Sequence, residues 1–101
     1  MAETTEVLHV VLAEWKDGVD AADQATQMSD ENLTTIDGVL SVSSGPTISG
    51  EGLEGGFDWM LVVRFRDRAA LDGYLPHPAH LPVAGFLGDS AARVVVFDIA
   101  A

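Results

Sequence analysis

The chain gathers its chemically versatile side chains in one short segment, Gly73-Tyr74-Leu75-Pro76-His77-Pro78-Ala79-His80. Two of the three histidines and the only tyrosine lie between positions 74 and 80. An imidazole titrates near neutral pH, and a phenol donates a hydrogen bond to a developing oxyanion, so these rings could serve as base and electrophile. The same rings between two helical segments are also typical of a hydrogen-bonded pair that locks a fold. The residues alone leave both interpretations open.

The elements that must position this segment follow from apolar patterning and turn residues. Strands are predicted where valine-rich or alternating apolar runs occur, over residues 7–15, 39–48, 57–65 and 93–99. Helices are predicted over residues 20–33 and 67–74, with a further helical segment after Pro78 to about Leu87. The first helix carries an apolar stripe at Val19, Ala22, Ala25, Thr26, Leu33 and Ile36. Asp67 stands at the amino end of the helix over residues 67–74, where a carboxylate accepts from free backbone N–H groups.

The order of these elements predicts the fold class. It reads β, α, β, β, α, β, which is typical of an α+β, ferredoxin-like protein with a four-stranded antiparallel sheet. The helices would cover one face of that sheet and leave the other bare. The length of 101 residues and mass of 10.7 kDa fit one domain over residues 1–101.

The bare face conflicts with an isolated monomer. Its strands carry apolar residues on both parities, and the parity assigned to the bare face holds Leu8, Val10, Leu12, Met60, Val62, Val94 and Val96. A second copy packed sheet to sheet about a twofold axis would cover this face. The sequence therefore predicts a homodimer through the sheet face.

Charge and composition narrow the function classes. Five Lys and Arg against sixteen Asp and Glu give a formal charge of −11, which disfavours nucleic acid and anionic membranes as partners. No apolar run approaches the length of a membrane span, and the acidic start, Met-Ala-Glu-Thr-Thr-Glu, does not resemble an export signal. The absence of cysteine suits a reducing compartment, so a cytoplasmic location is predicted.

A metal site is not predicted. His77 and His80 could bind a metal together with His9, but a proline lies between the pair and no acidic ligand is near them in sequence. The glycine-rich stretch over residues 49–56 predicts a mobile hairpin loop, which could act as a lid or have no function.

Three sequence features carry a resemblance to a known family. The string Tyr-Leu-Pro-His-Pro-Ala-His follows the third predicted strand. Gly45-Pro46 lies in the second strand, and Val94-Val95-Val96-Phe97-Asp98 lies in the fourth. Over nearly the whole chain, this pattern resembles the stress-responsive dimeric α+β barrel (Dabb) family. The family includes polyketide cyclases of the olivetolic acid cyclase type, which perform an aldol condensation without metal or organic cofactor.

The resemblance implies roles for individual residues. His80 would be the general base that removes a proton from a poly-β-ketone, and Tyr74 would hold the substrate and polarise a carbonyl. His9 matches a pocket histidine on the first strand, and its parity puts it on the helix-facing side. Trp59 stands where the plant cyclase has a histidine, so a different substrate is expected.

A small hydrophobic or aromatic ligand would suit the apolar residues around these rings. The substrate-binding candidates are His9, Trp59, His77, Leu75, Val83 and Phe86. Leu61, Leu71 and Leu87 would complete the lining, although residues at such spacings are more often simple core.

Two alternatives to a cofactor-independent cyclase follow from the same resemblance. One is a non-enzymatic, stress-responsive dimeric barrel or small-ligand-binding protein in which the histidine and tyrosine motif is structural. The other is a dimeric-barrel monooxygenase acting on an aromatic substrate, which is implied by fold analogy alone.

Overall fold

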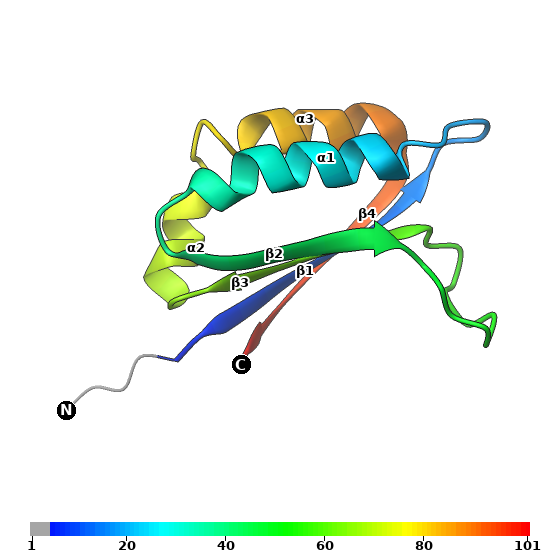
Figure 1. Cartoon of the computed structure of the whole chain (residues 1–101). Helices are drawn as coiled ribbons and strands as arrows, with labels where there is room; N and C mark the ends of the chain where they lie inside the picture. The colour runs from blue at the N-terminus through cyan, green and yellow to red at the C-terminus, as the bar shows by residue number, and fades with distance from the viewer. Residues whose placement is uncertain (1–4) are drawn as a thin grey trace.

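Four antiparallel strands form one sheet in the order β2-β3-β1-β4, and three helices pack on one of its faces (Figure 1). The structure is a computed structural model that describes residues 5–101. The elements are β1 (Val7–Trp15), α1 (Ala22–Asn32), a 3-10 turn η1 (Leu33–Thr35), β2 (Val39–Pro46), β3 (Trp59–Phe65), α2 (Arg68–Tyr74), α3 (Leu81–Ser90) and β4 (Ala91–Ala100). The predicted βαββαβ order and ferredoxin-like class are confirmed, with α2 and α3 together in the second helical position. The prediction about an export signal rests on the first six residues, of which 1–4 lie outside the described residues.

Several predicted boundaries differ from the structure at turns. The first helix begins at Ala22 rather than residue 20 and ends at Asn32, one residue earlier than predicted, where the 3-10 turn Leu33–Thr35 follows it. The second strand ends at Pro46 rather than residue 48, since proline has no N–H to continue a ladder. The third strand begins at Trp59, two residues later than predicted.

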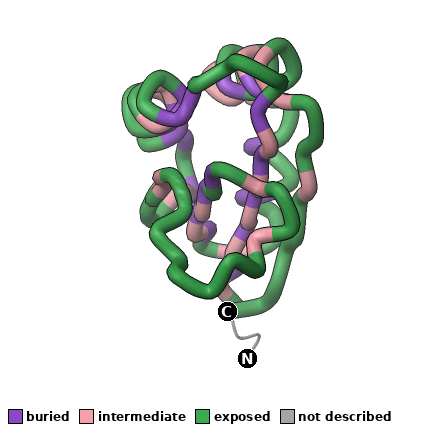
Figure 2. The backbone as a smooth tube through the Cα atoms, turned by 90° about the vertical axis from the view of Figure 1, so that its right-hand side faces the viewer, coloured by how far each residue is buried: buried purple, intermediate pink, exposed green. Residues whose placement is uncertain are grey.

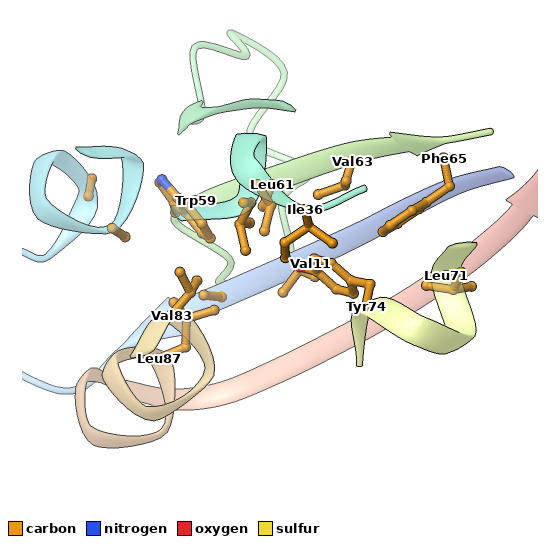
Figure 3. Close-up of a cluster of buried hydrophobic side chains, with 14 of the residues drawn as sticks. Val11, Ile36, Trp59, Leu61, Val63, Phe65, Leu71, Tyr74, Val83 and Leu87 are labelled. Carbon is orange, nitrogen blue, oxygen red and sulfur yellow. The ribbon is translucent and has the colours of Figure 1, made fainter. Parts of the chain in front are cut away.

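The core lies between the helices and one face of the sheet. Along β1 every second residue from Val7 to Trp15 is buried, and β3 repeats the pattern from Trp59 to Phe65. Figure 3 shows side chains from the strands and from the helices meeting in this layer. In Figure 2 the residues buried in this layer lie on the inner sides of the sheet and the helices. Because side chains alternate between the two faces of a strand, every second residue faces the helices.

The helices are held to the sheet by short apolar stripes and local caps. On α1 the buried residues are Ala22, Ala25 and Ser29, whose hydroxyl donates to the Ala25 carbonyl at 2.7 Å. Val19, predicted to begin this stripe, precedes the helix and is 38% exposed. The predicted cap of α2 is confirmed, because the Asp67 carboxylate accepts from the Ala70 N–H at 2.8 Å.

Strand register corrects one prediction about the bare face. Val94 and Val96 of β4 lie opposite Ala13 and Val11, so they belong to the helix-facing side rather than to the side of Leu12. Parity alone cannot relate one strand to another, because a one-residue shift of register exchanges the two faces. We call the face without helices the outer face; its apolar residues are Leu8, Val10, Leu12, Met60, Val62, Val95, Phe97 and Ile99.

Candidate functional site

The segment that carries the histidines and the tyrosine connects α2 to α3 by consecutive tight turns. The His77 N–H donates to the Tyr74 carbonyl at 3.0 Å, and the His80 N–H donates to the His77 carbonyl at 2.9 Å. Pro82 occupies the first turn of α3, where a missing N–H costs no helical hydrogen bond. These turns place His80 at the start of α3, close to Tyr74 at the end of α2.

The His80 ring is fixed by a backbone carbonyl. Its Nδ1 lies 2.9 Å from the Leu75 carbonyl oxygen. A carbonyl oxygen only accepts, so Nδ1 must carry the hydrogen, and in the neutral ring Nε2 keeps its lone pair. Burial lowers the pKa of His80; the bond to Leu75 acts in the opposite direction, and the nearby His9 lowers the pKa further. His80 is therefore a neutral imidazole at pH 7 with Nε2 free to accept a proton.

The Tyr74 phenol lies beneath this imidazole. Its ring centroid is 4.4 Å from that of His80 and 5.5 Å from that of His9, and the ring of Phe65 packs against its edge at 4.9 Å. Tyr74 is 1% exposed, and burial raises its pKa well above the ordinary value of 10.0. The phenol consequently stays protonated across the neutral range and can act only as a hydrogen-bond donor or a weak acceptor.

His9 is the third ring in the row and is bonded to the Asp98 carboxylate. It lies on β1 on the helix-facing side, as predicted, and is 4% exposed. Its Nδ1 is 2.6 Å from Oδ1 of Asp98, the residue directly opposite on β4. A carboxylate bonded to one ring nitrogen orients the imidazole and leaves the other nitrogen for a second partner.

Asp98 belongs to this site through its bond to His9, although the sequence did not predict it as a site residue. The available signal was its place as the only acid in the otherwise apolar run Val94-Val95-Val96-Phe97-Asp98-Ile99. A carboxylate at a helix-facing position of a strand requires a polar partner when it lies beside the core. The histidine opposite it could be named only once the register of β1 and β4 was known.

The other predicted site residues lie outside this row of rings. Trp59 is 1% exposed, tilts against Trp15, and donates its indole N–H to the Thr26 hydroxyl at 3.0 Å. Val83 is buried in the core, and Phe86 packs at its border. Figure 3 shows Trp59 of β3 and Val83 of α3 among the packed side chains of the core.

His77 and Leu75 take different places in the connection. The His77 Nδ1 accepts from the Ala79 N–H at 3.0 Å, and His77 borders a hollow together with Arg66. The Leu75 side chain is 47% exposed while its carbonyl holds His80. The structure thus brings together His9, Tyr74 and His80, and it separates His77 and Trp59 from them.

The space beside the rings is occupied by packed side chains. Leu61, Val63 and Leu71 are each at most 1% exposed, as is Tyr74 itself. A hollow of about 600 Å³ lies elsewhere, beside Leu12 and Met60 on the outer face. A ligand that touches both Tyr74 and His80 would therefore need the connection over residues 75–80 to move.

Two further features bear on the class of site. Across residues 5–101, no three histidine or acidic side chains lie close enough together to hold a metal ion. No helix in that part of the chain has the length and apolar character needed to cross a membrane.

The sheet order and the helices packed on one face define a ferredoxin-like α+β protein. The chain belongs to the family described as the stress responsive A/B barrel domain (Dabb), whose model matches residues 7–101. This confirms the family resemblance found in the sequence.

Known proteins of this kind differ in what they do. The stress-response A/B barrel domain-containing protein HS1 of Arabidopsis thaliana is 29% identical over 94 residues, covering 91% of this chain and 86% of its own. A dimeric ferredoxin-like protein of unknown function from Jannaschia sp. CCS1 has a TM-score of 0.82 at 24% identity, covering 95% of this chain and 99% of its own. The hydroxynitrile lyase of Passiflora edulis has a TM-score of 0.85 at 16% identity, covering 98% of this chain and 95% of its own. The last two likenesses show the fold alone.

Proposed function

We propose that this protein is a cofactor-independent acid–base catalyst acting on a ketone, in the manner of an aldol-type polyketide cyclase. The observation that carries the proposal is the bond between His80 Nδ1 and the Leu75 carbonyl. This bond leaves Nε2 of His80 available as a base. The imidazole is partly buried, and desolvation is the main cause of its lowered pKa.

The reaction would use the two rings in sequence. Nε2 of His80 takes a proton from a carbon between two carbonyl groups, and the Tyr74 phenol donates a hydrogen bond to the carbonyl oxygen that gains charge. The enolate carbon then attacks a second carbonyl carbon of the same chain, which forms the new C–C bond and an alkoxide. The imidazolium returns its proton to that alkoxide, so His80 ends neutral and the ring-closed aldol is the product.

His9 and Asp98 would keep this base active. Desolvation is the main cause of the lowered pKa of His80, and the nearby His9, which Asp98 orients, lowers it further. Asp98 acts through His9 and is a positioning residue in this proposal. Proton transfer by a placed side chain contributes about 10² to 10⁴ in rate, enough for an aldol step whose conformer is enforced by the site.

The substrate class follows from the surroundings of the rings. Leu71, Phe65 and Val83 are buried apolar residues, so a small hydrophobic or aromatic ligand fits better than a phosphate or a sugar. The net charge of −11 also disfavours long-range attraction of anions.

A second candidate is a non-enzymatic dimeric barrel, in which the rings lock α2 and α3 to the sheet. The specific observation in its favour is the closed packing around Tyr74, which is 1% exposed. In this case the His80 bond to Leu75 and the His9 bond to Asp98 serve only to satisfy polar atoms inside the fold.

We also propose that the protein is a homodimer through the outer face. Among the apolar residues there, Phe97 is 66% exposed, Ile99 50% and Met60 45%, which is unusual for large apolar side chains on one sheet face of a monomer. The charged residues that the strands place on this face are paired, Arg64 with Glu6 and Arg93 with Glu14. Two acidic copies can meet there without bringing unpaired like charges together.

An NMR titration of the histidine side chains, with and without a dihydroxybenzoic acid as a product-like probe, tests the catalytic proposal. We expect the His80 signals to titrate below pH 6.5 and to move when the probe is added, because the base must be reachable by a ligand. His77→Ala is the matched control, since His77 lies outside the row of rings. A His80 that neither titrates nor responds would rule out the catalyst and favour the structural candidate.

Turnover of an aromatic-polyketide precursor gives the second arm of the test. His80→Ala should abolish turnover while His77→Ala retains it, and both variants should keep the far-ultraviolet circular dichroism of the wild type. Loss of folding in His80→Ala alone would assign the ring to the scaffold instead.

A further inference from the structure

The connection between β2 and β3, residues 47–57, leaves the sheet on the side away from the helices. Figure 1 shows it turning down past the end of β2, and Figure 2 shows the same segment exposed and below the helices. We call residues 47–57 the arm. Two of its three large apolar side chains lie mostly in solvent, with Ile48 98% exposed and Leu53 79% exposed.

The arm nevertheless has a defined conformation. The Thr47 N–H donates to the Asp58 carbonyl at 3.0 Å, and the Thr47 hydroxyl donates to a Glu54 carboxylate oxygen at 2.6 Å. The Ser49 N–H donates back to the Thr47 hydroxyl at 3.1 Å. Ordering a backbone costs about 1–2 kcal/mol per residue, so a segment that buries little of its own apolar surface needs a compensating contact.

Arg93 ties the far end of the arm to the sheet. Its Nη2 donates to the Gly55 carbonyl at 2.7 Å, and its guanidinium lies 4.1 Å from the centre of the Phe57 ring. Gly56 has φ +94°, a backbone conformation that favours glycine, and a Cβ there would also lie 2.7 Å from a Glu14 carboxylate oxygen, which would have to move. The arm is therefore built on the strand ends that carry the Arg93–Glu14 ion pair of the outer face.

The arm and the outer face together enclose a hollow of about 600 Å³. Leu12, Met60 and Val62 belong to the outer face and form its floor. Ile48, Leu53 and Phe57 of the arm and Pro46 of β2 form its wall. The hollow is continuous with the apolar outer face, so whatever covers that face also meets the arm.

We propose that the arm is a dimerisation element whose Ile48 and Leu53 pack on the outer face of a second copy of this chain. The inference rests on the homodimer proposed above and names the arm residues that would contact the second copy. A twofold axis gives each copy one arm and one hollow, so the same surface supplies both the projecting and the receiving parts. The ion-paired outer face lets two chains of charge −11 approach at this surface, which supports a second copy as the occupant.

Sedimentation equilibrium of the full chain and its variants tests this proposal. The arm variant is Ile48→Ser with Leu53→Ser, which removes the apolar contacts without adding charge. Val19→Ser is the matched control, because Val19 is 38% exposed in the turn before α1 and lies away from the outer face. Phe97→Ser reports on the outer face itself, and circular dichroism checks that every variant is folded.

We expect the wild type to sediment at twice 10.7 kDa. The arm variant should raise the dissociation constant of the dimer at least about 30-fold, the size expected for losing an interface hot spot, while Val19→Ser leaves it unchanged. A dimer that is weakened by Phe97→Ser and unaffected by the arm variant would refute the role of the arm and retain the homodimer. A wild type that stays monomeric at high micromolar concentration would refute both. If the dimer ignores the arm variant but binds the apolar dye anilinonaphthalene sulfonate in the hollow, the occupant is a small ligand and the inference is wrong.

Discussion

His9 and Asp98 face each other across β1 and β4, with Nδ1 of the imidazole 2.6 Å from Oδ1 of the carboxylate. The His9 side chain is 5% exposed, whereas that of Asp98 is 36% exposed, because β4 is the edge strand of the sheet. The carboxylate therefore keeps part of its hydration while it orients a buried ring. This pair connects the sheet edge to Tyr74 and, through it, to His80.

Replacing Asp98 with asparagine should destabilise the fold. The substitution keeps the shape but removes the charged acceptor of a short hydrogen bond to a buried ring, a loss of about 1–3 kcal/mol. We expect urea unfolding at pH 7 to show a fall of that size in the free energy of unfolding. Asp89→Asn on α3 is the control, since Asp89 is exposed. Equal stability of both variants would show that the His9 contact contributes little.

The lowered pKa of His80 predicts a dependence of stability on acid. Desolvation is the main cause of the shift, so the unfolded chain binds the proton more readily than the native one. Stability from this residue is present above the unfolded pKa near 6.5 and is lost as pH falls toward the lower native value. The unfolding free energies of the wild type and His80→Gln should therefore converge between pH 7 and pH 5. A difference that stays constant over this range would contradict the buried, neutral imidazole.

The buried phenol predicts the opposite behaviour in alkali. Burial raises the pKa of Tyr74 above its ordinary value of 10.0, so above about pH 10 the unfolded chain loses a proton that the native chain retains. The native state should lose stability as pH rises past that value. Because this is the only tyrosine, its phenolate absorbance should appear together with the change in tryptophan fluorescence that marks unfolding. A phenolate that forms while the protein is still folded would show that the ring is accessible, as the catalytic proposal in its open form requires.

Substitutions at Gly38 and Gly18 distinguish the cost of backbone strain from the cost of a steric clash. Both have a positive φ, +87° and +75°, but a Cβ on Gly38 would lie 2.5 Å from the Ala70 Cβ of α2 while one on Gly18 would meet nothing within 4 Å. Alanine at Gly18 should cost about 1–2 kcal/mol for the left-handed backbone alone. Alanine at Gly38 should cost clearly more, because the chain must also move away from α2. Denaturant midpoints of the two variants measure the difference, and equal losses would contradict the close approach.

The sequence by itself determined the order of the elements and the inner faces of β1 and β3. β1 over Val7–Trp15 was predicted with its observed bounds, because a nearly continuous, valine-rich apolar run is typical of a strand. The capping role of Asp67 followed from a local rule that needs only neighbouring backbone atoms. The segment over residues 74–80 was also recognised from residue type and spacing alone.

Only the tertiary structure decided which residues meet across strands. The register of β1 with β4 moved Val94 and Val96 to the helix-facing side and put Asp98 against His9, and no periodicity within one strand contains that information. Packing likewise decided that Trp59 and Val83 fill the core, since an apolar side chain is equally suited to line a cavity or to close it. Pairing and packing depend on contacts between residues far apart in the chain, and those contacts exist only once the sheet has formed.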